Sequence, residues 1–452
     1  MAKQAARAEP EPGLSRGPVA GMSHRGIASL LALLLSVSTP AASGSAQQAP
    51  STPIQALVGA SLAKVASIRG LPSPPSPPPV VIRSRSETKQ FFEQELARKR
   101  PAERVEAERK AMVALGLIPG DFDLRGFLAD LLSEQAGAYY DTARKVMVVG
   151  DWLKAEEQAI ALAHELVHAL QDRQISIEKF LVPGPGKGDQ QLARQALLEG
   201  EAVAVTVELV LQPRGLDLSR TPTLGGVQQL AMAFSGAAGP AFGKAPKFLQ
   251  HLLLFPYVQG LTFVHQFRLR QPWPAFDRLY QDPPRSTTQI LHPEKLFDRR
   301  EDPVVITLPD PRLALPPGWS LVTEDELGEW GLGEVLGTVL DEATSQRLAI
   351  GWRGDRYQVL EDGQGQLALI YRVRWETEEP ARAFAQAYAG LIEKKHRLAG
   401  KGAHWPGSLW SWQDGSQTSA VERRGAEVLV LERVPTAAER RLRQRIWSGG
   451  QS

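Results

Sequence analysis

The chain has 452 residues, of which 43% are hydrophobic and 23% are charged, so it is long enough to form two or three domains with a sizeable core. Its formal net charge is only +2, so the composition excludes a strongly basic protein and gives no indication of nucleic-acid binding. It contains no cysteine, which excludes disulfide bonds, thiolate metal ligands, a cysteine nucleophile and a lipoprotein anchor.

Residues 1–46 have the order of a secretory signal peptide. Arg25 precedes an apolar run at residues 27–38, which is too short to span a bilayer, and the small residues 44–46 follow it. A start at Met22 would give this signal ordinary proportions. We therefore expect an exported protein, periplasmic or extracellular, with no stable membrane insertion after cleavage. The alternative is a membrane anchor that stays uncleaved.

The rest of the chain divides by composition into three parts. Residues 47–83 are rich in Pro, Ser and Ala and predict a disordered tether. Residues 84–317 predict a mainly helical domain with a short antiparallel sheet, and residues 318–452 predict a smaller α+β domain of unknown role. The expected fold class is therefore α+β. A further hypothesis is that residues 47–115 act as an inhibitory propeptide.

In chain order, the expected elements of the two domains follow from hydrophobic periodicity and turn residues. They are helices at 87–115 and 122–134, a hairpin with strands at 137–141 and 145–149, helices at 155–173 and 190–211, a largely helical stretch at 225–281, a loop at 283–317, strands at 357–360, 367–375 and 427–433, and helices at 378–395 and 437–447.

The helix at 155–173 contains the sequence His-Glu-Leu-Val-His at residues 164–168. His164 and His168 are four residues apart, so both imidazoles lie on one helix face and can bind one tetrahedral Zn²⁺. Glu165 lies about 100° around the helix, where it can hold a metal-bound water and accept its proton. Zinc lowers the pKa of such a water to roughly 7, which provides a nucleophile at neutral pH. The alternative is that these three polar residues are satisfied by hydrogen bonds in the core.

A catalytic zinc needs a third protein ligand and one open position. The helix at 190–211 offers two acids, Glu199 and Glu201, whose side chains point about 200° apart, so only one of them can face the metal. Helix geometry does not choose between them. The acid that does not bind the metal is expected on a solvated face.

These two motifs together resemble the gluzincin metallopeptidases, which combine HExxH with a Glu on a second helix. The Glu-Gly-x-Ala pattern at residues 199–202 looks like the third-ligand motif of the aminopeptidase branch, so the resemblance favours Glu199 as the ligand. Two features depart from the family. The gap of 31 residues from His168 to Glu199 is longer than in that branch, and Val203 stands where thermolysin-like enzymes have an Asp. Asp172, one turn past His168, is therefore the candidate for orienting a ligand; the alternative is a helix-surface acid.

A closer resemblance is to uncharacterised bacterial exported proteins with a zincin-like core, and it covers roughly residues 84–300. Four segments carry it, at residues 138–141, 164–172, 196–202 and 284–293. The resemblance implies a zincin-like fold but supplies no substrate.

Two further expectations concern the substrate cleft. In zincin-like folds an edge strand pairs with an extended peptide substrate, and residues 145–149 are the candidate here, with an ordinary sheet strand as the alternative. His292, in a loop before Pro293, is a candidate for stabilising the oxyanion that forms when water attacks a carbonyl. A helix-capping or surface histidine explains the same position equally well.

The sequence therefore predicts an exported zinc metallopeptidase with Glu165 as general base, acting on a peptide or protein and not on nucleic acid. The alternative is a weakly active or inactive zincin-like module that serves a structural or binding role in the cell envelope. An intact Glu165 argues against that alternative, because an inert descendant has no reason to keep the base. A third hypothesis, a helical protein with HExxH by chance, gives no reason for Glu-Gly-Glu at residues 199–201.

Overall fold

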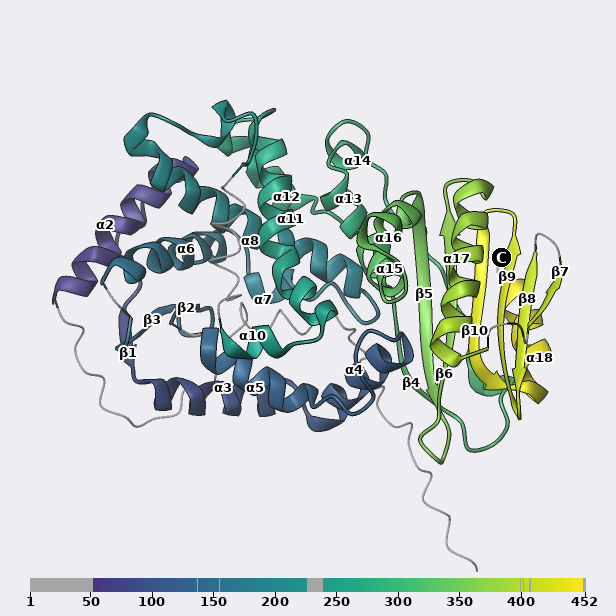
Figure 1. Cartoon of the computed structure of the whole chain (residues 1–452). Helices are drawn as coiled ribbons and strands as arrows, with labels where there is room; N and C mark the ends of the chain where they lie inside the picture. The colour runs from purple at the N-terminus through teal and green to yellow at the C-terminus, as the bar shows by residue number, and fades with distance from the viewer. Residues whose placement is uncertain are drawn as a thin grey trace, which may run out of the picture.

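The computed structural model describes residues 52–135, 137–153, 155–225, 239–398, 400, 402–405 and 408–449. The predicted signal peptide at residues 1–46 lies outside these ranges. The fold is α+β, as predicted: a mainly helical N-terminal unit with a small sheet is followed, from residue 318, by a C-terminal unit built on an antiparallel sheet (Figure 1). None of the helices in the described ranges combines the length and the apolar character that crossing a membrane requires.

From residue 84 onward, the N-terminal unit follows the predicted order of helices and strands, but the stretch predicted as a loop at 283–317 contains three short helices, at 287–291, 294–297 and 311–313. It contains α2 (Thr52–Arg69), β1 (Val80–Arg83), α3 (Arg85–Lys99), α4 (Ala102–Ala114), α5 (Leu124–Gln135), β2 (Ala138–Asp141), β3 (Val146–Gly150), α6 (Ala155–Gln174), α7 (Ile177–Phe180), α8 (Gly188–Leu211), η2 (Gln212–Arg214), η3 (Leu218–Arg220), α10 (Pro240–Lys244), α11 (Lys247–Arg268), η4 (Trp273–Asp277), α12 (Arg278–Gln281), α13 (Thr287–Leu291), α14 (Glu294–Phe297) and η5 (Pro311–Leu313). The helix predicted at 87–115 is two helices, α3 and α4. Pro101 separates them because proline disfavours helical geometry in the residue before it.

Residues 52–69 form a packed helix, so the prediction of a disordered tether over 47–83 is wrong for this segment. Four apolar residues of α2 are at most 2% exposed: Val58, Leu62, Val65 and Ala66. Their spacing is that of one helix face, and this face packs against α6 and α8. The strand β1 follows before residue 84. Folded structure therefore begins at least 32 residues earlier than the predicted boundary at residue 84.

The small sheet has the strand order β1-β3-β2, with β1 parallel and β2 antiparallel to β3. The predicted hairpin is therefore present. However, the strand proposed to pair with substrate, at residues 145–149, corresponds to β3, which is the central strand. Both of its edges are already hydrogen-bonded, by β1 and by β2. The strand that borders α6 is instead the edge strand β2.

The C-terminal unit is a seven-stranded antiparallel sheet with helices on both faces. Its elements are β4 (Ser320–Asp325), α15 (Gly328–Gly337), α16 (Glu342–Ala349), β5 (Trp352–Glu361), β6 (Leu367–Trp375), α17 (Glu378–His396), β7 (Ala403–Trp405), β8 (Leu409–Asp414), β9 (Gln417–Arg424), β10 (Glu427–Pro435) and α18 (Thr436–Ser448), and the strand order is β4-β5-β6-β10-β9-β8-β7.

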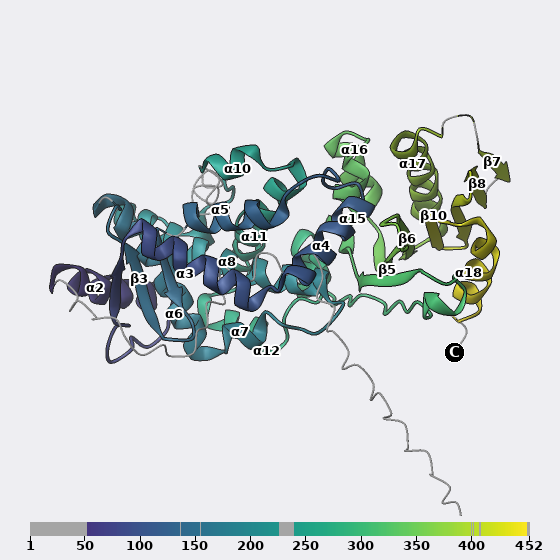
Figure 2. The same ribbon diagram turned by 90° about the horizontal axis from the view of Figure 1, so that it is seen from below.

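Alternation along β6 explains how both faces of this sheet are covered. Leu369 and Tyr371 belong to the apolar cluster that includes Phe384 of α17, whereas Ala368 and Ile370 belong to a second cluster with α18. Successive strand residues point to opposite faces, so one strand serves two cores. The first cluster continues into the N-terminal unit, where α4 contacts β4 and β6 between the two units (Figures 1 and 2).

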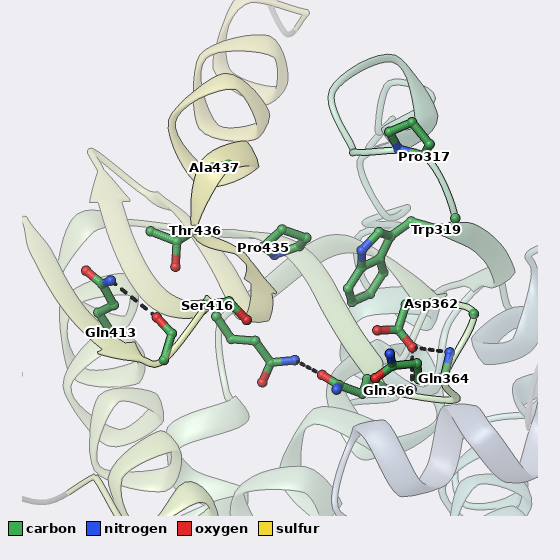
Figure 3. Close-up of a pocket in the computed structure, with 14 residues that line it drawn as sticks. Pro317, Trp319, Asp362, Gln364, Gln366, Gln413, Ser416, Pro435, Thr436 and Ala437 are labelled. Carbon is green, nitrogen blue, oxygen red and sulfur yellow. Dashed lines mark hydrogen bonds between the residues drawn. The ribbon is translucent and has the colours of Figure 1, made fainter.

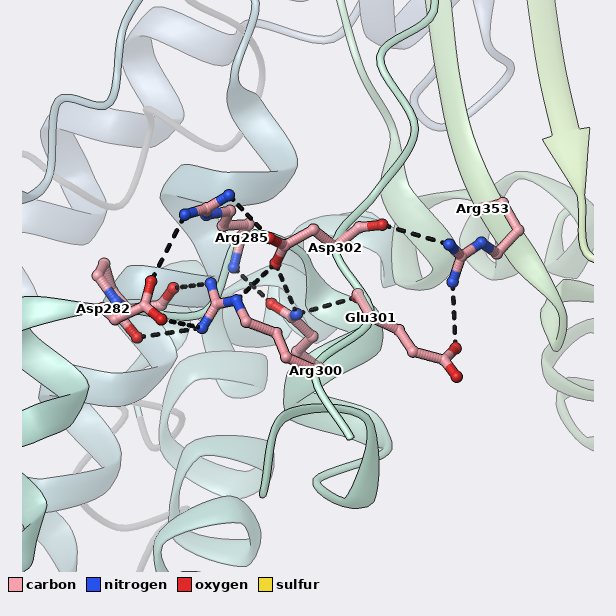
Figure 4. A network of polar contacts seen from close by, with 8 residues as sticks. Asp282, Arg285, Arg300, Glu301, Asp302 and Arg353 are labelled. Atoms are coloured by element: carbon pink, nitrogen blue, oxygen red, sulfur yellow. Dashed lines mark hydrogen bonds and ion pairs between the residues drawn. The ribbon is translucent and has the colours of Figure 1, made fainter. Parts of the chain in front are cut away.

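A network of charged residues joins the segment after α12 to the C-terminal unit (Figure 4). Arg285 Nη1 lies 2.7 Å from Asp302 Oδ2, and Arg353 Nη1 lies 3.1 Å from Glu301 Oε2. Gln289 accepts the backbone N–H of Arg285 at 2.7 Å and donates to the Glu301 carbonyl at 3.0 Å. Residues 284–293, which carried part of the sequence resemblance, therefore form a structural joint between the units.

Three buried acids and one partly buried acid meet beside this joint: Asp189 at the start of α8, Asp325 at the end of β4 and Asp355 in β5 are buried, and Glu326, which follows β4, is partly buried. Asp325 Oδ1 accepts the backbone N–H of Gly188 at 2.9 Å, and the Thr287 hydroxyl donates to Asp189 at 2.6 Å. Burial raises the pKa of Asp325 to about 7, of Glu326 to about 7 and of Asp355 to about 6.

The contribution of this acid cluster to stability should fall as pH rises. The folded-state pKa of Asp325 is above its unfolded value, so its contribution to stability is fully present below about pH 4 and is lost as pH rises through about 7. Asp325→Asn should therefore be more stable than the parent at pH 8, by at most about 4 kcal/mol, and no more stable than the parent below pH 4. Urea unfolding at both pH values measures this, with the exposed Asp121→Asn as control. A difference that does not change with pH would contradict it.

Candidate metal centre

Packing between α6 and α8 positions the predicted metal ligands. His164 and His168 of α6 are 5% and 2% exposed, and Glu199 of α8 is 1% exposed. Four neighbours on α6, namely Leu162, Ala163, Leu166 and Val167, are also buried, because this helix is apolar nearly all round. The structure therefore brings three potential ligands together within the core, with their ligand atoms all within 4.8 Å of one another. We call His164, His168 and Glu199 the metal group.

The separations within the metal group fit one tetrahedral zinc ion. His164 Nε2 lies 3.2 Å from His168 Nε2 and 3.2 Å from Glu199 Oε2, and His168 Nε2 lies 3.5 Å from that oxygen. Zinc bonds of about 2.0–2.1 Å place tetrahedral ligands about 3.3–3.4 Å apart. Two imidazoles and a carboxylate are also a donor set that zinc accepts, with a fourth position left for water.

Charges within the metal group stabilise one another. Burial alone would raise the pKa of Glu199, but the His168 and His164 imidazoles lower it to about 2. Burial likewise opposes a charge on His168, whereas Glu199 and Glu165 raise its pKa to about 9. The surroundings of the metal group therefore favour a positive charge beside the carboxylate, which a divalent cation would supply.

The structure assigns different roles to the two acids of α8. Glu199 faces the histidines, whereas Glu201 accepts hydrogen bonds from Arg69 of α2, from the Tyr280 hydroxyl and from Gln171 Nε2, the last at 2.7 Å. Glu201 is 1% exposed, so it is not the solvated acid that we expected. It is instead paired in the core with a buried arginine.

Gly200 allows α11 to approach α8 closely, and this brings a further partner, Tyr257, to Glu199. A Cβ on Gly200 would overlap the backbone of Gly260 in α11, and a Cβ on Gly260 would overlap the Ala196 carbonyl. The two helices therefore pack with their backbones in contact. One turn before Gly260, Tyr257 donates its hydroxyl to Glu199 Oε1 at 3.2 Å, and its ring stacks on that of His164 with centroids 6.1 Å apart.

Gln171 orients His168. Its Nε2 donates to the Leu198 carbonyl at 2.9 Å and to Glu201, so its Oε1 must act as the acceptor for His168 Nδ1, which lies 2.7 Å away. The proton on His168 is thereby fixed at Nδ1, and Nε2 is left for a metal. Sequence reasoning missed Gln171, although its place three residues after His168 on one helix face could have indicated it.

Asp172 does not hold a metal ligand, in contrast to our expectation. It accepts hydrogen bonds from the Tyr140 hydroxyl at 3.3 Å, from Lys145 Nζ and from the Ile177 backbone N–H at 3.3 Å. It therefore ties the end of α6 to the hairpin and to α7.

Glu165 lies beside the metal group, next to the edge strand. Its Oε2 accepts the backbone N–H of Tyr140 in β2 at 2.9 Å, and burial raises its pKa while the two imidazoles oppose that rise. His292 is placed differently from our expectation. Its Nε2 lies 2.6 Å from Glu329 Oε1 of α15, so the ring links the two units. This contact differs from the predicted role, which was to stabilise the oxyanion.

Comparisons with known proteins agree with this class of site. Residues 122–214 match the family model described as the IrrE N-terminal-like domain, Peptidase_M78. The match spans most of α5 through α8 and includes the metal group and Glu165, which supports a metallopeptidase-like family for this part of the chain. Residues 319–443 match a second family, the domain of unknown function DUF8575, which covers most of the C-terminal unit. No curated protein and no solved structure matches the chain.

Proposed function

We propose that the protein is an exported zinc metallopeptidase that hydrolyses peptide bonds. The observation that carries the proposal is the convergence of His164, His168 and Glu199 at tetrahedral separations beside Glu165. The family match at residues 122–214 supports a peptidase-like domain. The signal-like sequence at residues 1–46 supports the export part of the proposal.

Each polar residue around the site has a role in this proposal. A bound Zn²⁺ would polarise the scissile carbonyl and lower the pKa of the attacking water. Glu165 accepts a proton from that water as its oxygen bonds to the carbonyl carbon, and returns the proton to the amine as the C–N bond breaks. The Tyr140 N–H fixes the Glu165 carboxylate, while Tyr257 and Gln171 hold Glu199 and His168 in place.

The edge strand β2 is the strand that we propose for binding an extended substrate. The carbonyl of Gly137, just before β2, accepts the backbone N–H of Gly150 in β3, and the carbonyl of Asp141, at the end of β2, accepts that of Lys145 in the turn before β3. Tyr140, between them, points its backbone N–H toward Glu165 instead. A peptide that pairs with this edge would therefore lie directly beside the general base.

Metal content tests the proposal. The full chain, purified without added metal, should contain about one zinc per molecule by elemental mass spectrometry. Glu199→Ala should lose that zinc, whereas Glu201→Gln, which keeps the hydrogen-bonding capacity of the other acid, should retain it. No zinc in a folded parent, even after zinc is added, would overturn the proposal.

Cleavage is measured next on an unstructured protein such as casein, with fragments identified by mass spectrometry. Removal of zinc by a chelator should stop cleavage, and zinc should restore it. Zinc binding without any cleavage would favour the alternative, a zincin-like module with a structural or binding role.

A further inference from the structure

The C-terminal unit has a pocket of about 880 Å³ at one end of its sheet, far along the chain from the metal group. Four connections form it: the segment before β4, the β5–β6 turn, the β8–β9 turn and the start of α18 (Figure 3). Neither edge strand of the sheet, β4 or β7, contributes a residue to its lining. The pocket is therefore built by turns and side chains, with no strand edge open to pair with a peptide.

The lining of the pocket is rich in hydrogen-bonding groups and carries almost no charge. Among the residues that the structure describes, the lining contains four glutamines and no Lys, Arg or His. Asp362, the one ionisable residue among these, accepts the backbone N–H groups of Gln364 at 2.8 Å and Gln366 at 2.9 Å, so this carboxylate closes the β5–β6 turn. An anionic ligand would meet no cationic side chain among the described lining residues. Side-chain amides both donate and accept, which suits a neutral ligand with many hydroxyl or amide groups.

Two of the glutamines are held in place before any ligand binds. Gln417 is buried; its Nε2 donates to Gln366 Oε1 at 2.5 Å, and its Oε1 accepts from Arg433 Nε at 2.7 Å. Because Gln366 uses its oxygen in this bond, its NH₂ group is the part that is left to donate to a ligand. Groups fixed in advance lose less conformational freedom on binding, which strengthens affinity.

Trp319 adds an apolar surface to this polar pocket. It packs against the apolar cluster that contains Leu442 of α18, yet it stays partly exposed. Figure 3 shows its indole ring in the pocket wall, between Pro317 and Asp362. An aromatic face offers a flat apolar area to which the C–H face of a sugar ring is complementary, while the hydroxyl groups at the ring edge can reach the amides.

We propose that this pocket binds a neutral saccharide. The inference does not depend on the proposed peptidase activity, since none of its residues belongs to the metal group or touches Glu165. An extended peptide is disfavoured because no strand edge lines the pocket. A phosphorylated or acidic ligand is disfavoured because none of the described lining residues has a cationic side chain.

Saturation-transfer NMR on the full chain tests the proposal, with maltotriose, cellotriose and chitotriose as separate probes. At least one of the three should bind with a dissociation constant of about 1 mM or tighter. Trp319→Ala and, independently, the exposed Gln366→Ala should each weaken that binding at least about tenfold. Gln346→Ala, an exposed glutamine on α16, is the matched control and should leave it unchanged.

Three results would overturn the proposal: no transfer to any of the three sugars, sugar binding that survives both pocket substitutions, or binding of a triproline peptide in place of the sugars. Because Gln366 is exposed, its substitution should not disturb folding, and it remains informative if Trp319→Ala does not fold.

Discussion

Glu165→Gln should lower the rate of peptide hydrolysis about a thousandfold while zinc stays bound, since general-base catalysis typically contributes about 10²–10⁴-fold. The amide has the same shape as the carboxylate but cannot accept the proton of the attacking water. It still offers an oxygen to the Tyr140 N–H, so the position of the side chain is kept. The turnover number and the zinc content, measured on the same preparation, separate loss of the base from loss of the metal.

Glu178→Gln is the control for this substitution, because Glu178 is an exposed acid on α7 outside the site. It should hydrolyse at the parent rate. If Glu165→Gln kept full activity, or lost activity only in proportion to lost zinc, the assignment of Glu165 as the base would have to be abandoned.

Arg69→Met should destabilise the fold by about 3–5 kcal/mol, the range typical of breaking a buried ion pair. Arg69 is fully buried. It pairs with Glu201, lies 2.5 Å from Asp277 Oδ1, and its guanidinium sits 5.1 Å from the Trp273 ring centre. Without it, the charge of Glu201 is left in the core with only neutral donors. The free energy of unfolding in urea measures the loss.

Two further variants show whether the unpaired charge of Glu201 causes the loss of stability. Arg69→Met combined with Glu201→Gln removes both charges and should recover part of the lost stability. Arg220→Met removes an arginine whose side chain is 77% exposed and whose partner Asp217 is 35% exposed, and it should change the free energy of unfolding by less than about 1 kcal/mol. A loss of under 1 kcal/mol for Arg69→Met alone would show that α2 is not held by this pair.

Local sequence patterns were sufficient to predict the part of the site that lies within single helices. The spacing of His164 and His168 and the order of helices from 155 to 211 depend on contacts within a few residues. The choice of Glu199 over Glu201 depends instead on where α11 and α2 pass over α8. Arg69 is 132 residues from its partner Glu201, and Tyr257 is 58 residues from Glu199, so no periodicity could have indicated either contact.

The predictions that differ from the structure also concern contacts between residues far apart in the sequence. Helix α2 is composed largely of small residues beside a proline-rich stretch, so composition suggested a tether, while its apolar stripe at residues 58, 62, 65 and 66 was the more informative signal. Asp172 was assigned to the site because it lies one helical turn after His168, and His292 because it was expected in a loop before Pro293. Their hydrogen bonds go to the hairpin and to α15 instead, which only the three-dimensional arrangement determines.

Helix α8 has a mechanical consequence. It begins at the acids of the joint, with Asp189, and reaches Glu199 ten residues later, a rise of about 15 Å. A helix is stiff along its axis. A shift of the C-terminal unit that moves the start of α8 should therefore move Glu199 by a similar amount. Catalytic geometry is sensitive to errors of about 1 Å. For the proposed metal site, we therefore expect the contacts at the joint to help align the Glu199 carboxylate, and substitutions that loosen these contacts should first weaken metal binding.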